Sequence, residues 1–407
     1  MQFGDYISRL KGDRKIWMVI FVLSFISILI VYSSTGALAF RRAGGNTTYY
    51  FFKQVLIQAA GFMFMLLMIK YLNVKFYNKI ANLVLLSAIF FVVVGIVIGR
   101  GSGRTIPLGP FSFQPAELAK VAVMMWVARI LSATGESDQA KGKSFFMILG
   151  GIGILGFLLI KVNFSSAVLV MSTAFIMMFV ARIPMKYLAG AILTVTILFV
   201  SLFLVRNNLP EIVYKGTRME TVFNRIDRYI TGTDPKRNDG LTQDEFAKIA
   251  IYNGGFLGVG AGKGDISNRM SAAYNDFVFA IIVEEYGLAG AGIIIILYLI
   301  LLTRGLMIVK ACKRTFPLYL ATGAVTMILL QALVNMGVSS GAIPVTGQPL
   351  PWISWGGTSQ IFTAFIFGFL LSISAENQSE LQKQDPVESR EEDDFSEEDI
   401  ILSNIEK

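Results

Sequence analysis

Residues 16–38 read IWMVIFVLSFISILIVYSSTGAL, an apolar stretch without a single charged side chain. A helix needs about 20 apolar residues to cross the hydrocarbon core of a bilayer, and this stretch is long enough. Comparable stretches recur along the chain, separated by short polar segments. The predicted spans are 16–38, 54–70, 80–98, 114–131, 145–160, 164–181, 187–205, 277–303, 317–337 and 358–374. The sequence therefore predicts an all-α integral membrane protein with about ten transmembrane helices.

The composition agrees with a membrane protein and narrows the chemistry. Of the 407 residues, 54% are hydrophobic and 16% are charged, against roughly 25% charged in an ordinary soluble domain. Histidine is absent and Cys312 is the only cysteine. This excludes Ser-His triads, imidazole general bases, internal disulfides and almost every zinc site. Any acid–base catalysis must use carboxylates, Lys or Tyr.

The distribution of Lys and Arg predicts the orientation of the spans. Residues 1–15 are polar and basic, and the apolar run after them is long enough to remain as an anchor, so no cleavable signal peptide is expected. Ten spans place both termini on one side. Outside residues 206–276, most Lys and Arg lie in the segments on that side. Cytoplasmic segments carry such an excess, so both termini are predicted to be cytoplasmic.

Two segments are predicted to lie outside the membrane. Residues 206–276 form one large extracytoplasmic loop, whose aromatic side chains, among them Tyr252 and Phe256, are expected to be buried against the outer ends of the spans. Residues 376–407 hold 12 acidic and 3 basic side chains, which predicts an acidic, disordered cytoplasmic tail. The chain thus divides into a membrane domain, residues 1–375, and this tail.

Ionisable side chains inside or at the mouths of spans are candidate functional groups, because burying a charge in a bilayer is costly. Glu117 and Lys120 lie three residues apart on one face of the fourth span. Asp276 stands at the outer mouth of the eighth span, and Glu284, eight residues on, is expected on roughly the same face. Two alternatives stay open. The first pair could only fix helix packing, and Asp276 could be a helix cap.

Two glycine-containing segments are the remaining candidates. The run at 254–264 contains Lys263 but does not match a nucleotide P-loop, because Gly264 follows the lysine and Leu257 stands where a glycine is required. Its backbone amides and Lys263 could approach a lipid pyrophosphate, or the run could be a tight structural turn. Residues 341–359 are too rich in Pro and Gly for a regular helix, which predicts an outer loop or a re-entrant segment.

Three ordered motifs, at 107–120, 275–287 and 344–359, resemble the SEDS family of shape, elongation, division and sporulation proteins, which includes FtsW and RodA. The resemblance covers nearly all of residues 10–375, and the residues before the first span are closer to the FtsW branch. It implies a ten-helix glycosyltransferase of the bacterial cytoplasmic membrane that polymerises lipid II into peptidoglycan strands at the outer face. The implied partners are lipid II, a class B penicillin-binding transpeptidase and other divisome or elongasome membrane proteins, with no nucleic acid.

By this resemblance Asp276 is the family's essential carboxylate, and Glu117 and Lys120 are its charged cavity pair. The expected cavity also includes Arg104, Gln114, Glu284, Lys263, Ser354 and Thr358. No protein-held metal site is expected, and the resemblance leaves open whether a divalent cation assists at the pyrophosphate.

The sequence also departs from the family pattern. Residues 161–166, KVNFSS, replace the common Pro-Asp-Leu-Gly stretch, and Tyr274 and Asn275 replace the usual His-Thr before the aspartate. An imidazole therefore cannot be required for the chemistry. Two other functions compete with the enzyme: a lipid II flippase, since buried charges and broken helices are typical of transporters, and a non-catalytic scaffold whose acidic tail recruits cytoplasmic partners.

Overall fold

The computed structural model describes residues 11–34, 47–98, 105–108, 111–205, 218–231, 241–264, 266, 269 and 273–380. The helices in chain order are α2 (Arg14–Ser34), α4 (Thr47–Tyr71), α5 (Val74–Ile98), α6 (Pro115–Ser132), α7 (Asp138–Val162), α8 (Phe164–Val180), α9 (Met185–Val205), α11 (Arg218–Thr231), α12 (Gln243–Gly254), α14 (Ala273–Asp276), α15 (Val278–Ala311) and α16 (Thr315–Ser339). A further helix, Gly357–Glu380, is called the C-terminal helix. Strands β1 (Ile106–Leu108) and β2 (Phe111–Phe113) form a small antiparallel hairpin before α6.

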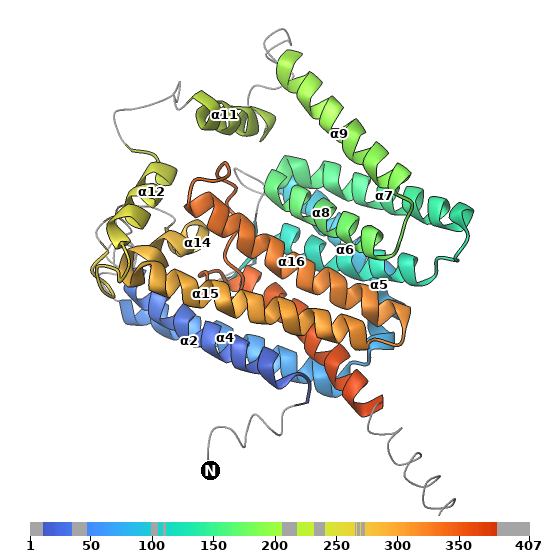
Figure 1. Ribbon diagram of the computed structural model, residues 1–407, viewed down its shortest axis with the longest axis horizontal. Helices are drawn as coiled ribbons and strands as arrows, with labels where there is room; N and C mark the ends of the chain where they lie inside the picture. Colours follow the sequence, from blue (N-terminus) through green and yellow to red (C-terminus); the bar gives the residue numbers. More distant parts are fainter. Residues whose placement is uncertain are drawn as a thin grey trace, which may run out of the picture.

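Helices occupy all ten predicted spans, so the all-α membrane fold is confirmed (Figure 1). Eight of the described helices are long and apolar enough to cross a bilayer. The other two fall short for identifiable reasons. α8 has 17 residues, and α6 has 18 residues but carries Glu117, Lys120 and Arg129.

Both described ends of the chain lie at the same end of the bundle. Gly12 lies against the backbone of Leu371 in the C-terminal helix, and Arg314 forms ion pairs with Glu376 and Glu380. We call this the terminal end. α11, α12 and α14 gather toward the opposite end, which we call the loop end (Figure 1). An even number of membrane spans places both termini on the same side of the membrane, in agreement with this arrangement.

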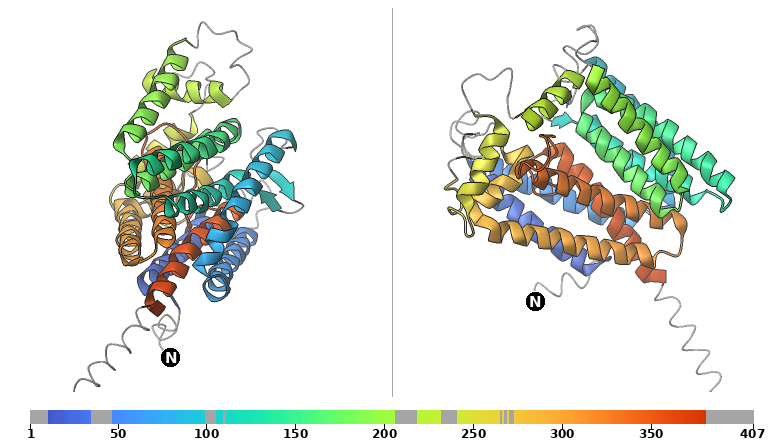
Figure 2. Two further views of the ribbon diagram at one scale, coloured as in Figure 1. Left: turned by 90° about the vertical axis from the view of Figure 1, so that its right-hand side faces the viewer. Right: turned by 45° about the horizontal axis from the view of Figure 1, so that its top comes forward.

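α6 is the central helix, and α9 is the peripheral one. Of the 18 residues in α6, 14 are buried, and the helix packs against α5, α7, α8 and α16. Leu188 is the single buried residue of α9, which lies at the edge of the bundle (Figures 1 and 2). A helix that is apolar all round and this exposed is suited to a lipid environment.

The described parts of the long loop form α11 and α12. Phe223 of α11 is buried and contacts the rings of Phe199 and Phe203 in α9. Three aromatic residues of the loop differ from the expectation that they are buried, because Tyr229 is 50% exposed, Tyr252 is 86% exposed and Phe256 is 71% exposed. At the other segment outside the membrane, the C-terminal helix continues to Glu380, beyond the predicted start of the acidic tail at 376; residues 381–407 lie outside the described part.

α15 is broken near its start, and the glycine run fills the break. Gly287 has non-helical backbone angles, φ 67° and ψ −169°. The amides of Leu288 and Ala289 donate to the carbonyls of Gly255 and Phe256, at 3.0 and 3.1 Å. These are the first amides of the second helical segment, which have no partner within the helix itself. The glycine run therefore caps the long part of α15.

The opposite side of the same break is also bonded to the glycine run. The amide of Val259 donates to the carbonyl of Glu284 at 2.9 Å, and that of Gly260 donates to the carbonyl of Glu285 at 3.0 Å. The approach is so close that a Cβ on Gly258 would lie 2.2 Å from the Glu285 carbonyl oxygen. Of the two alternatives for this run, a tight structural turn is the one the backbone contacts support.

Candidate active site

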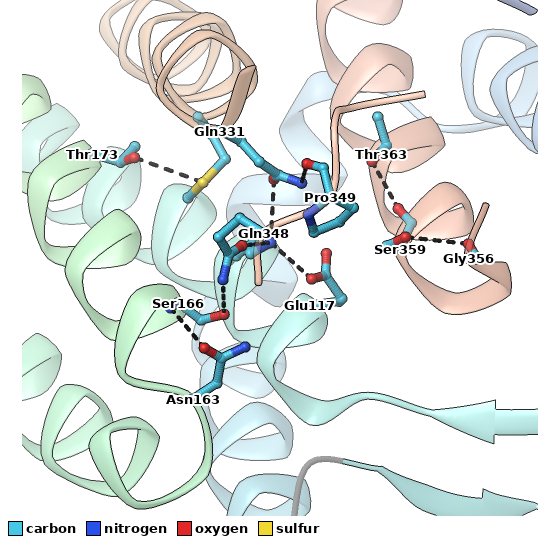
Figure 3. Close-up of polar contacts among 12 residues, drawn as sticks. Glu117, Asn163, Ser166, Thr173, Gln331, Gln348, Pro349, Gly356, Ser359 and Thr363 are labelled. Carbon is cyan, nitrogen blue, oxygen red and sulfur yellow. Dashed lines mark hydrogen bonds and ion pairs between the residues drawn. The ribbon is translucent and has the colours of Figure 1, made fainter. Parts of the chain in front are cut away.

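The centre of the polar site is Lys120, a residue that is 0% exposed. Its Nζ donates to Glu117 Oε1 at 2.8 Å, and to Gln331 Oε1 and Gln348 Oε1 at 3.2 Å each (Figure 3). An ammonium group has three N–H donors, and all three have acceptors. A buried ion pair is tolerated when its remaining hydrogen bonds are satisfied in this way. Lys120 thereby joins α6 to α16 and to the segment after α16.

Gln348 links this cluster to α8. Its Nε2 donates to Ser166 Oγ at 3.1 Å, and the Ser166 amide in turn donates to Asn163 Oδ1 at 3.3 Å (Figure 3). Asn163 is the N-cap of α8. The stretch that departs from the family pattern, residues 161–166, therefore supplies both a helix cap and a hydroxyl that contacts the cluster.

Asn335 of α16 connects the cluster to Asp276. The Nδ2 group of Asn335 donates to the backbone carbonyl of Asp276 at 2.9 Å and to that of Gln348 at 2.8 Å. The Asp276 carboxylate faces Gly347, because a Cβ added to this glycine would lie 3.3 Å from Oδ2. The structure thus brings Glu117, Lys120 and Asp276 into one polar region. The connection between Lys120 and Asp276 runs through Gln348 and Asn335.

Asp276 is the last residue of α14, and the non-helical residue Phe277 separates it from α15. Phe277 has φ −123° and ψ 28° and is the N-cap of α15, with no side-chain cap bond. The expectation that Glu284 shares a helical face with Asp276 assumed an unbroken helix and is therefore not met. Nor does Asp276 occupy the cap position of α15, which removes the main support for a role as a helix cap. Its side chain is half-buried.

Glu284 and Glu285 hold the loop and α2 in place. Both are buried. Glu284 Oε1 accepts a hydrogen bond from the Ile266 amide at 2.9 Å, and the hydroxyl of Ser33 in α2 donates to the carboxylate of Glu285 at 2.6 and 2.7 Å. The contact between Glu285 and Ser33 has no signal in the sequence, since serine at a helix end is common.

The other expected cavity residues have separate positions. Ser354 is buried, accepts from the Leu350 amide and donates to the Asn275 carbonyl, both at 2.8 Å, so it fixes the residue before Asp276. The hydroxyl of Thr358 donates to the Ser112 carbonyl in the β-hairpin.

Three more expected residues complete the placement. Gln114 is half-buried at the N-cap of α6 and makes no side-chain cap bond. Lys263 is exposed, and its amide donates to the Gly260 carbonyl. Arg104 lies outside the described residues.

Two cavities flank residues 343–345 at the loop end. One has a volume of about 280 Å³, lies between α8, α11 and α16, and is lined mostly by apolar side chains such as Val168, Leu169 and Val334. The other has a volume of about 270 Å³ and is lined partly by charged groups, Asp244 and Lys248 among them. Arg225 lines both cavities and donates from Nη1 to the Val345 carbonyl at 2.7 Å. Arg225 lies within the predicted loop at 206–276, and no signal in the sequence connects it with residues 343–345.

The described residues also show whether acidic or thiol side chains are grouped closely enough to bind a metal ion. In this part of the chain no three carboxylate or thiolate side chains lie close enough together to hold a metal ion. At Asp276, the described contacts are a hydrogen bond from Asn335 to the backbone carbonyl and the approach of Gly347 to the carboxylate.

Comparison with known proteins places this site in a family. Residues 13–379 match the profile of the cell cycle protein family that comprises FtsW, RodA and SpoVE, and the chain belongs to this family. It is 30% identical over 373 residues to a probable peptidoglycan glycosyltransferase FtsW of Geobacter metallireducens, covering 89% of this chain and 95% of that protein. It is also 30% identical over 400 residues to the corresponding protein of Legionella pneumophila, covering 92% and 94%.

Solved structures show the same fold. A chain from a peptidoglycan synthase complex, described for its coordination of polymerization and crosslinking, superposes with a TM-score of 0.70 at 23% identity, covering 90% of this chain and 98% of that one. The rod shape determining protein RodA of Thermus thermophilus gives a TM-score of 0.62 at 21% identity, covering 91% and 99%.

Proposed function

We propose that the chain is a peptidoglycan glycosyltransferase that polymerises lipid II at the outer face of the bacterial cytoplasmic membrane. The observation that carries this proposal is the position of Asp276, a half-buried carboxylate at the loop end, joined through Asn335 and Gln348 to the buried Lys120 cluster. Family membership and the names of the relatives at 30% identity support the same activity. The loop end is then extracytoplasmic, and both termini are cytoplasmic.

In the proposed reaction Asp276 is the general base. The hydroxyl oxygen of the acceptor sugar forms a bond to the anomeric carbon of the donor, and the bond from that carbon to the pyrophosphate oxygen breaks. The hydroxyl proton passes to the Asp276 carboxylate, and undecaprenyl pyrophosphate leaves. General-base assistance of this kind contributes typically 10²–10⁴-fold.

Elimination also favours Asp276 among the carboxylates of the site. Glu117 pairs with Lys120, and Glu284 and Glu285 are buried and accept hydrogen bonds from the loop and from α2. Histidine is absent. Asp276 is half-buried, and its carboxylate lies against Gly347.

The two cavities suit an amphiphilic substrate. The apolar cavity between α8, α11 and α16 matches the chemistry of a polyprenyl chain. Arg225 and Lys248, which line the charged cavity, would bind a pyrophosphate, because cationic side chains form strong charge-assisted hydrogen bonds to phosphate oxygens. Gln114, Lys263 and Ser354, which the sequence predicted to line the substrate cavity, are further candidates for binding the substrate.

A flippase is the second candidate, and one observation favours the enzyme over it. A flippase needs a polar path across the bundle. From Val121 to Ala128 the central helix α6 presents no charged side chain, and most of this stretch is buried. The charged groups of α6 that face the site are thus confined to its loop-end half.

The proposed partners follow from the same function. A class B penicillin-binding transpeptidase would crosslink the strands that this chain polymerises, and the structural neighbour that belongs to a peptidoglycan synthase complex supports such a pairing. The relatives named FtsW support the division branch and other divisome proteins as neighbours.

The test is a polymerisation assay with purified protein and lipid II in detergent micelles. No bilayer is present, so a flippase has nothing to transport across, and glycan polymer on a gel supports the enzyme. The assay is run with and without the co-purified transpeptidase, and with a crosslinking inhibitor to isolate polymerisation. Monomeric, well-folded protein that forms no polymer in either condition would reject the proposal in favour of the flippase or the scaffold.

A further inference from the structure

Two large apolar side chains project from the glycine run at the loop end. Phe256 is 71% exposed and Leu257 is 77% exposed. We call these two residues the apolar tip. Leaving apolar side chains of this size in water is unfavourable. An exposed pair on a rigid turn therefore indicates a surface that something apolar covers.

The apolar tip is held in a fixed position on α15. The carbonyl of Phe256 accepts from the Ala289 amide, and Val259 donates to the Glu284 carbonyl. The tip thus lies beside the break in α15, between Glu284 and Ala289. Its height along the bundle is the height of this break.

Two contacts between α2 and α15 give that height relative to the bilayer. At the terminal end, Arg304 Nε donates to Asp13 Oδ2 at 3.0 Å. At the loop end, Ser33 bonds to Glu285. The 20 residue steps from Asp13 to Ser33 span about 30 Å at 1.5 Å per residue, which equals the thickness of the hydrocarbon core. The break in α15, and the tip with it, therefore lies at the boundary of this core.

The surface below the tip is a lipid-facing surface. Leu288, Ile293, Ile296 and Leu299 of α15 are each more than half exposed, and the helix carries no charged residue between Glu285 and Arg304. The apolar tip lies next to Leu288 and extends this surface toward the loop end.

We propose that Phe256 and Leu257 insert into the outer leaflet of the bilayer and anchor the extracytoplasmic loop to the membrane surface. The occupant is lipid, because the tip lies at the hydrocarbon boundary and is continuous with the lipid-facing side of α15. The anchor fixes the depth of α12 and of the glycine run, which cap the long segment of α15. The insertion of the tip depends on the fold and stands whether or not the chain polymerises lipid II, whereas the choice of the outer leaflet rests on the orientation given with the proposed function.

Spin labelling tests this placement directly, because Cys312 is the only cysteine. In a Cys312→Ser background, a nitroxide is attached at Phe256→Cys or Leu257→Cys. The full chain is reconstituted in vesicles of phosphatidylethanolamine and phosphatidylglycerol. Oxygen concentrates in the hydrocarbon and a water-soluble nickel chelate stays outside, so the ratio of the two collision rates reports depth. Ile293→Cys is the lipid-facing reference, and Glu136→Cys, on an exposed turn, is the aqueous reference.

We expect the ratio of the oxygen to the nickel collision rate at both tip positions to be at least about fivefold higher than at Glu136→Cys. It should therefore approach the ratio at Ile293→Cys. A ratio equal to that of Glu136 would place the tip in water and overturn the anchor. Low collision rates with both reagents would show that protein covers the tip, a second copy in this preparation, and would overturn it equally. Both positions are exposed, so the labelled variants should elute as the unlabelled protein does, which is checked by gel filtration.

Discussion

Lys120 shows how the site is assembled at the scale of single residues. The apolar context and the Glu117 spacing marked it as a candidate from the sequence, and the structure buries it completely with three acceptors. Two of these acceptors, Gln331 and Gln348, could not be predicted. An uncharged amide in an apolar or Pro-rich stretch carries no local signal, and its partner is more than 200 residues away in the chain.

Asp276→Asn separates a chemical role from a structural one. We expect the variant to keep its fold, because Asn has the same shape and the backbone carbonyl of residue 276 still accepts from Asn335. Polymerisation should fall at least about a hundredfold, the lower range of general-base assistance. Asp138→Asn, at an exposed position at the start of α7, is the matched control and should keep full activity. Unchanged activity in Asp276→Asn would transfer the chemistry to another carboxylate.

Gln348→Leu tests the contribution of the amide between Lys120 and Ser166. The substitution keeps a similar volume and leaves the buried ammonium without one acceptor, which costs about 1–3 kcal/mol. We expect a lower unfolding temperature in detergent and at least a tenfold loss of polymerisation. Gln58→Leu is the matched control, because Gln58 is equally buried but its side-chain amide has no hydrogen-bond partner among the described residues. Equal behaviour of the two variants would count against the network.

At the scale of elements, the apolar runs predicted the spans correctly, whereas the breaks in the helices were not predicted. Span length is set locally by the bilayer, so a window of about 20 residues contains the information. The break at Gly287 is flanked by hydrogen bonds to and from the glycine run, which lies some 30 residues earlier. The composition of the glycine run is unusual in the sequence, but nothing in the sequence indicates that it packs against the break in α15.

Gly258→Ala tests whether the glycine run supports α15. Gly258 has φ +81°, and an added Cβ would lie 2.2 Å from the Glu285 carbonyl oxygen. The left-handed backbone alone costs a non-glycine residue about 1–2 kcal/mol, and the clash adds to it. We expect a clear drop in thermal stability. Gly292→Ala, at a helical position in α15 with no atom within 4 Å of the added Cβ, should be neutral or stabilising by up to about 1 kcal/mol. Equal melting temperatures would show that the run can relax.

At the scale of the whole molecule, the two ends of the bundle carry different kinds of polar groups and cavities. The terminal end holds ion pairs between Arg304 and Asp13 and between Arg314 and the end of the C-terminal helix. The loop end holds Asp276 and the two cavities. The sequence predicted this division from the positions of charges relative to the spans. It could not predict the cavities, because one forms where α11 meets α8 and α16 and the other where α11 meets α12 and the segment after α16, and contacts between segments so far apart in the chain leave no local signal.

Deletion of residues 381–407 tests this division between the ends. The C-terminal helix ends at Glu380, which pairs with Arg314 at the terminal end, so the truncation keeps this ion pair. Asp276 lies beyond the opposite half of a bundle about 30 Å thick. We therefore expect polymerisation of lipid II by the purified truncated protein to stay within about twofold of the full chain, because a segment that begins at the terminal end has no route through the bundle to the site. The measurement is the polymer yield over time, at equal amounts of monomeric protein. Loss of activity in well-folded truncated protein would mean that the acidic tail acts on catalysis across the membrane, and the separation of the two ends would then be wrong.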